Sequence, residues 1–100
     1  MSLPLVLWQE AEDELIDSRK YYERQQPGLG EEFVDEVDRV FLRISANPRL
    51  HAAIHYDIRK AIVNRFPFCI YYIAEPSEIA VVSVFHTKRD PNIWKVRRGP

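Results

Sequence analysis

Residues 59–94 read RKAIVNRFPFCIYYIAEPSEIAVVSVFHTKRDPNIW, and this stretch decides the fold. It contains three runs rich in β-branched and aromatic residues, separated by two turns that contain proline. We predict three strands from these runs, at Ile58–Phe66, Phe68–Ala74 and Ile79–His86. Short turns join neighbouring strands in an antiparallel manner. The stretch therefore predicts an antiparallel β-sheet built from consecutive strands.

The alternation of side chains along these strands assigns residues to faces. In the first predicted strand, Arg59 and Arg65 fall on the same face, where both can contact one anionic partner. Exposed arginines are common, so solvation or pairing with a helix carboxylate is the alternative explanation. The third strand is apolar on both faces from Ile79 to Phe85, which predicts an internal position in the sheet.

Two amphipathic helices precede the strands. Apolar residues recur in both at helical spacing, and the segment Gln26–Gly30 separates the two helices. Asn47 and Pro48 end the second helix. An antiparallel helical hairpin packed on the sheet would bury both apolar stripes. The positions expected to face the sheet are Ala11, Leu15 and Tyr22 in the first helix, and Leu29, Phe33, Val37, Val40, Phe41 and Ile44 in the second.

Shorter elements are expected at both ends of the chain. Leu5–Trp8 reads as a strand, and a short helix or turn follows the last strand. Asp90 is a candidate helix cap, with Pro91 at the first helical position. The tail over residues 95–100 is expected to be partly disordered. The fold class is therefore α+β in the order β-α-α-β-β-β, with a short C-terminal helix or turn, in a single domain spanning residues 1–100.

The composition is that of an ordinary globular protein, with 46% hydrophobic and 29% charged residues. No apolar run is long enough to cross a bilayer. The apolar N-terminus lacks the basic start and the cleavage site of a signal peptide, so we expect a cytoplasmic protein with no membrane contact. The single cysteine, Cys69, lies in an apolar strand and is expected to be an inert core residue.

The formal net charge of −1 conceals two halves of opposite sign. Residues 1–50 carry 6 basic and 11 acidic residues, a net of −5, whereas residues 51–100 carry 8 and 4, a net of +4. The acids are explained by solvation of the exposed helix faces. The basic residues lie on strands and at strand ends, where they favour an anionic partner.

The last strand ends in a group of cations, His86, Lys88 and Arg89. An apolar strand does not need such a group for folding, so we consider it a candidate binding surface. His86 shares its predicted face with Val82 and Val84, which makes it half-buried. For that reason a structural role for this histidine is favoured over proton transfer.

A metal site is not expected. His51 and His55 are four residues apart, a spacing that binds zinc when both histidines lie on one helix face. This segment follows a helix stop, has no helical periodicity and lacks a third ligand. With three glycines in the whole chain there is also no glycine-rich phosphate loop, and no cofactor is expected.

Together these segments resemble the RelE/ParE superfamily of small bacterial toxins from toxin–antitoxin pairs, and most closely its ParE-like, plasmid-stabilisation branch. The resemblance spans nearly the whole chain and implies a helical hairpin on an antiparallel sheet, together with a cognate antitoxin whose C-terminal segment wraps the toxin. The matching positions are Ala11, Glu14, Leu15, Tyr21, Tyr22, Pro27–Gly30, Phe33, Ile44, Asn47, Pro48, Arg59, Phe66, Pro67, Ile70–Tyr72, Val84–His86, Arg89–Pro91 and Trp94.

The resemblance implies one of two modes of toxicity. RelE-like members cleave mRNA in the ribosomal A site, whereas ParE-like members poison DNA gyrase without nuclease chemistry. A nuclease must activate a 2′-OH with a base and stabilise developing charge. The catalytic candidates for that role are His86, Arg59, Arg65 and Arg89.

Two observations favour the gyrase-type mode. The pI of about 6.3 is far from that of the strongly basic nucleases. Trp94 stands roughly where those toxins often carry a tyrosine, and an indole cannot act as a general base. The protein is therefore more simply explained as a binding toxin than as an enzyme. An mRNA interferase is the alternative, and a degenerate, non-toxic family member is the third possibility.

The basic surface at the end of the last strand is expected to contact the antitoxin or the cellular target, which is gyrase or the ribosome. The antitoxin should contribute apolar anchors and carboxylates to this basic surface. Without the antitoxin, self-association into a homodimer is another way to cover it. The contact residues expected are Arg59, Arg65, His86, Lys88, Arg89 and Trp94.

Overall fold

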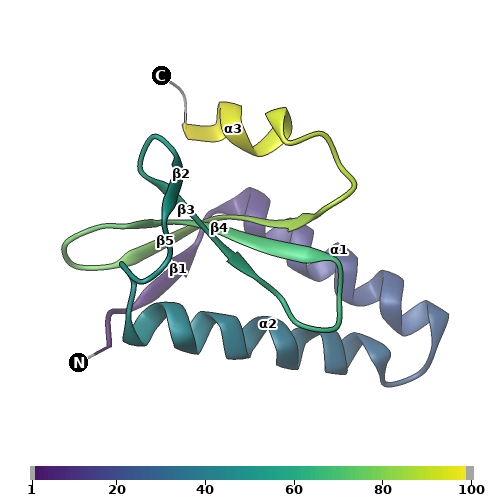
Figure 1. The fold of residues 1–100 in the computed structure, drawn as a ribbon. Coiled ribbons are helices and arrows are strands. Elements are labelled where there is room, and N and C mark those ends of the chain that lie inside the picture. The colour runs from purple at the N-terminus through teal and green to yellow at the C-terminus, as the bar shows by residue number, and fades with distance from the viewer. Residues whose placement is uncertain (1, 99–100) are drawn as a thin grey trace.

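A computed structural model describes residues 2–98 of the chain. A helical hairpin, α1 and α2, covers one side of a five-stranded sheet, and a short helix, α3, lies on the other side (Figure 1). The elements are β1 (Leu5–Leu7), α1 (Gln9–Gln25), α2 (Leu29–Ala46), β2 (Ala53–His55), β3 (Ile58–Ile62), β4 (Phe68–Ala74), β5 (Ile79–His86) and α3 (Asn92–Arg98).

The sheet is mixed, with strand order β1-β5-β4-β3-β2. Strands β3, β4 and β5 pair antiparallel as predicted, and β5 is internal. The prediction of a purely antiparallel sheet is wrong, because β1 runs parallel to β5, with Leu5 opposite Ile79 and Leu7 opposite Val81. No tight turn joins these two strands. The long connection through the helices and the other strands therefore permits the parallel direction.

The first strand of the predicted meander differs from its expected extent. It was predicted to reach Phe66 but ends at Ile62. The following turn closes with a hydrogen bond from the Val63 N–H to the carbonyl of Phe68, and Arg65 adopts a left-handed conformation with φ 71°. A further strand, β2, was not predicted. It has three residues, too few to show a recognisable alternation, and pairs irregularly with β3.

Both faces of the sheet bury apolar side chains. Between the hairpin and the sheet, Phe33, Val37, Val40 and Ile44 of α2 are fully buried, which confirms most of the predicted stripe. Phe41 is only partly buried. On the opposite face a second cluster lies between the sheet and α3, and on β3 Lys60 and Ile62 are exposed. The members of this second cluster are Ile58, Cys69, Tyr71, Ile73, Ala80, Val82, Phe85 and Trp94.

The turn of the helical hairpin is held by a carboxylate of α1. Glu23 accepts hydrogen bonds from the N–H groups of Gly28 (2.9 Å) and Gly30 (3.1 Å), two otherwise unpaired donors at the start of α2. A Cβ at Gly30 would lie 2.6 Å from the carbonyl oxygen of Arg19. Only glycine permits this close approach of the two helices.

Two further sequence-based expectations concern single side chains. Cys69 is buried, and burial raises the pKa of its thiol, as expected for an inert core residue. Asp90 accepts a hydrogen bond from the N–H of Asn92 (2.9 Å), so it caps the start of α3 as predicted. Of the tail 95–100, residues up to 98 belong to α3, and residues 99–100 lie outside the described part. No helix in the described part combines the length and apolarity needed to span a membrane.

Candidate functional site

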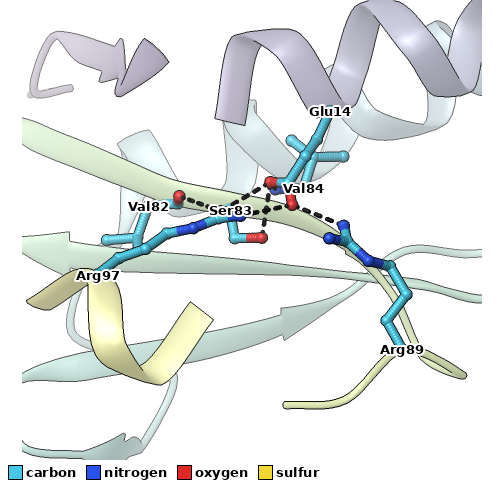
Figure 2. Close-up of polar contacts among 6 residues, drawn as sticks. All are labelled: Glu14, Val82, Ser83, Val84, Arg89 and Arg97. Carbon is cyan, nitrogen blue, oxygen red and sulfur yellow. Dashed lines mark hydrogen bonds and ion pairs between the residues drawn. The ribbon is translucent and has the colours of Figure 1, made fainter. Parts of the chain in front are cut away.

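The most connected charged group described in the structure is the carboxylate of Glu14 on α1 (Figure 2). Arg97 of α3 donates two parallel hydrogen bonds of 2.9 Å to its two oxygens, and Arg89 donates a third of 2.8 Å. The side chains of Glu14 and Arg97 are 12% and 11% exposed, whereas that of Arg89 is 41% exposed. Bidentate arginine–carboxylate geometry of this kind is strong and directional.

This ion pair closes an open edge of the sheet. Strand β1 stops pairing with β5 at Val81, and the next residue, Val82, forms a bulge that has no partner on β4. Beyond that point the N–H of Val84 donates to Glu14 (3.2 Å), and the carbonyl of Val82 accepts from Arg97 (3.1 Å). The Ser83 hydroxyl also donates to Glu14 (2.8 Å). Two side chains thus satisfy the backbone groups that a longer β1 would have paired.

Arg89 is fixed at this site and still partly open to solvent. Its guanidinium lies 4.7 Å from the centre of the Phe85 ring and bonds to Glu14 through one nitrogen. A guanidinium carries five N–H donors, so most of them stay available to an anionic group of a partner. Lys88 beside it is exposed. These two cations are the predicted site residues that remain exposed next to each other.

His86 is half-buried at the end of β5, as predicted. Its ring packs edge-on against Phe68, with 5.1 Å between ring centres. The N–H of Lys88 donates to the Nδ1 atom of His86 (3.1 Å), which holds the ring against the end of the strand. His86 also borders a hollow of about 290 Å³ between α1 and the sheet, whose other lining residues are Asp17, Ser18, Tyr21, Tyr22 and Phe68.

Arg59 has a structural partner. Its Nη1 donates to the carbonyls of Arg49 and His51, in the segment that follows α2. The Tyr72 hydroxyl donates to the carbonyl of Pro48 in the same segment (2.8 Å). Arg59 and Tyr72 therefore fasten the exit of α2 to the sheet.

Arg65 lies at the other end of α2, where it bonds to Glu32 (2.7 Å) and to the buried Glu36 (3.5 Å). The prediction that Arg59 and Arg65 lie on the same face of one strand is therefore wrong. The alternation on which it rested stops at Ile62, where β3 ends. The alternative explanation for Arg65, pairing with helix carboxylates, is the one observed.

Trp94 is a core residue rather than an exposed contact residue. It is 2% exposed and stacks on Tyr71, with 3.9 Å between ring centres and 17° between ring planes. His55 meets the indole edge-on at 5.7 Å. Burial raises the pKa of Tyr71 to about 12. The aromatic stack attaches α3 to the sheet. This packing buries the indole, so Trp94 is not part of the exposed contact surface that the sequence predicted.

Comparison with known proteins places this arrangement in a family. Residues 5–91 match the family described as "ParE toxin of type II toxin-antitoxin system, parDE". The chain belongs to this ParE toxin family. Among solved structures, a chain of the "Chromosomal ParDE TA system from P. aeruginosa" has the same fold, with a TM-score of 0.76 at 14% identity over 87% of this chain and 98% of that one. No curated protein matches the chain.

The matched range includes only part of the Glu14 site of this ParE toxin. Glu14 and Arg89 lie inside the matched range, whereas Arg97 lies beyond its end at residue 91. Sequence reasoning assigned no role to Glu14 and placed Arg97 in a loose tail. The available signal was small: Glu14 directly precedes Leu15 at the border of the apolar stripe of α1, where an unpaired carboxylate would be costly.

Within residues 2–98, no group of three or more His, Cys, Asp or Glu residues is placed to hold a metal ion. The two histidines at zinc-like spacing have separate aromatic neighbours. His51 faces Tyr72, and His55 lies between Tyr56 and Trp94.

Proposed function

We propose that this ParE toxin acts by binding its target, with DNA gyrase as the target, and that it uses no nuclease chemistry. The observation that carries the proposal is the half-buried position of His86, whose ring accepts a hydrogen bond from the Lys88 N–H and packs edge-on against Phe68. A half-buried ring that is held in this way fits a structural role better than proton transfer.

The positions of the other catalytic candidates also support the proposal. Arg59 bonds to backbone carbonyls after α2, Arg65 bonds to carboxylates in the first half of α2, and Arg89 bonds to Glu14. Transition-state stabilisation requires donors aimed at one point. The three guanidinium groups instead have three separate sets of partners, each of which serves the fold.

We propose that a ParD-like antitoxin covers the exposed basic residues Lys88 and Arg89 with carboxylates. The solved structure of the same fold comes from a ParDE system, which supports a partner of this kind. A second contact is available on β3, because β2 pairs only with its first two residues. Beyond them, Lys60 is exposed and Ile62 is 66% exposed. An extended antitoxin segment can add here as a strand.

The proposal is tested by inducing the chain in cells with and without the product of the neighbouring reading frame. Growth should stop with the chain alone and resume when both are made. In pull-downs, Lys88→Glu and Arg89→Glu should each weaken the complex at least tenfold, whereas Lys20→Glu on exposed α1 should leave it unchanged. Unaltered growth would identify a degenerate family member. Unaltered affinity in both variants would place the antitoxin on another surface.

A further inference from the structure

The hollow beside His86 combines aromatic walls with a single formal charge. Tyr22 and Phe68 lie at 6.2 Å between ring centres, and Phe68 contacts the His86 ring at 5.1 Å. Tyr21 packs edge-on against Tyr22 at 5.3 Å and is 51% exposed. The aromatic rings thus hold one another in place before any ligand arrives, which lowers the entropic cost of binding.

Asp17 supplies the charge of this hollow. It lies one helical turn before Tyr21 on α1 and is exposed. Across the described residues the structure gives the Asp17 side chain no hydrogen bond and no ion pair, although Arg19 and Lys20 follow it closely on the same helix. Its carboxylate is therefore available, and the hydroxyls of Ser18 and Tyr21 add acceptors around it.

We infer that this hollow binds an arginine side chain projecting from a partner protein. The exposed ring of Tyr21 can attract a cation, and the carboxylate pairs with a guanidinium through two parallel hydrogen bonds. The apolar stem of an arginine suits the walls formed by Tyr22 and Phe68. Lysine offers neither the flat stacking surface nor the bidentate geometry.

The volume of the hollow and the charge of Asp17 both favour an arginine side chain over other ligands. A volume of about 290 Å³ lies at the lower limit for sites of drug-sized ligands and suits one side chain. An anionic group would be repelled by Asp17. A purely apolar anchor would make no use of the Asp17 carboxylate, whereas a guanidinium pairs with it. The exposed basic pair Lys88 and Arg89 follows His86 directly in the chain, so a partner that carries both signs of charge can contact the hollow and the pair together.

The test uses nuclear magnetic resonance of the whole chain, with N-acetyl-arginine methylamide as the probe and its citrulline analogue as a neutral probe of the same shape. The arginine probe should shift the ring signals of Tyr21, Tyr22 and His86 and saturate at millimolar concentration. The citrulline probe should bind roughly tenfold more weakly, because it lacks the charge-assisted bonds. The variant Asp17→Asn should bind both probes equally weakly, and Asp35→Asn on exposed α2 should behave like the parent chain.

The inference is overturned if the two probes bind equally to the parent chain, or if Asp17→Asn keeps full affinity for the arginine probe. Tighter binding of N-acetyl-leucine methylamide than of the arginine probe would also overturn it and assign the hollow to an apolar anchor. Unchanged thermal unfolding of Asp17→Asn checks that the fold is intact. Neither antitoxin nor gyrase enters the experiment, so its result is independent of the proposed function.

Discussion

Glu14 and Arg97 are joined by two hydrogen bonds of 2.9 Å although 83 positions separate them in the chain. The pair links α1 to α3 across the edge of β5, at the point where β1 has ended. It satisfies the backbone of β5 and holds Arg89 in a defined position. The fold and the exposed basic surface therefore depend on the same carboxylate.

Replacing Arg97 with Gln should lower the free energy of unfolding by about 3 kcal/mol, because the largely buried carboxylate of Glu14 loses its bidentate partner. Urea denaturation of the purified chain measures this change. Lys20→Gln, on an exposed part of α1, serves as the control and should change stability by less than about 0.5 kcal/mol. A loss below about 1 kcal/mol for Arg97→Gln would mean that the pair is not an important support of α3.

Phe33 and Phe41 should differ as truncation sites, although they belong to the same predicted stripe. Phe33 is fully buried and contacts the rings of Tyr22, Phe66 and Phe68, so Phe33→Ala should cost about 3–5 kcal/mol. Phe41 is partly buried and should cost clearly less. Parallel urea titrations of the two variants decide the point, and equal losses would contradict the observed difference in burial.

High pH should destabilise the protein through Tyr71. Burial raises the pKa of this phenol from 10.0 to about 12, so the folded state holds the proton more tightly than the unfolded state does. Its contribution is fully present below pH 10 and is lost as the pH rises from about 10 through about 12. Burial shifts the pKa values of Tyr22 and Tyr72 in the same direction.

Urea titrations near pH 9 and near pH 11 measure the effect of the Tyr71 phenol. The free energy of unfolding should be lower at the higher pH, and the difference should shrink in Tyr71→Phe. An equal difference in the parent chain and in the variant would assign the pH dependence to other groups.

Replacing His86 with Gln should leave growth arrest mostly intact, because the proposed mode of action uses no proton transfer at this residue. Growth curves after induction, with equal protein levels verified, provide the measurement. A nuclease that relies on this imidazole should instead lose roughly 100-fold or more of its cleavage rate. Complete loss of toxicity in a folded His86→Gln variant would contradict the binding mode.

The sequence predicts the longer elements well, for identifiable reasons. Strands β4 and β5 are apolar runs bounded by proline-containing turns, and α2 combines a regular apolar stripe with a stop at Asn47. The strands β1 and β2 have three residues each, which is too few to show alternation. The sequence therefore indicated neither the existence of β2 nor the parallel pairing of β1 with β5. The left-handed conformation of Arg65 has no signal in the sequence either, because no glycine marks it.

The candidate site was predicted only in part. Lys88 and Arg89 follow an apolar strand, and that local contrast identified them as exposed cations. The partnership of Glu14 with Arg97 joins positions that only the folded chain brings together. The same limit explains Trp94, which looks like a contact residue in a polar tail until α3 places it on Tyr71.

The measurement that tests the proposed mode of action most directly is DNA supercoiling by purified gyrase, run beside translation in a ribosome extract, with the same purified chain added to each. The binding mode predicts that supercoiling is inhibited, that His86→Gln inhibits equally, and that mRNA stays uncut in the extract. Intact supercoiling together with ribosome-dependent mRNA cleavage that disappears in His86→Gln would contradict it.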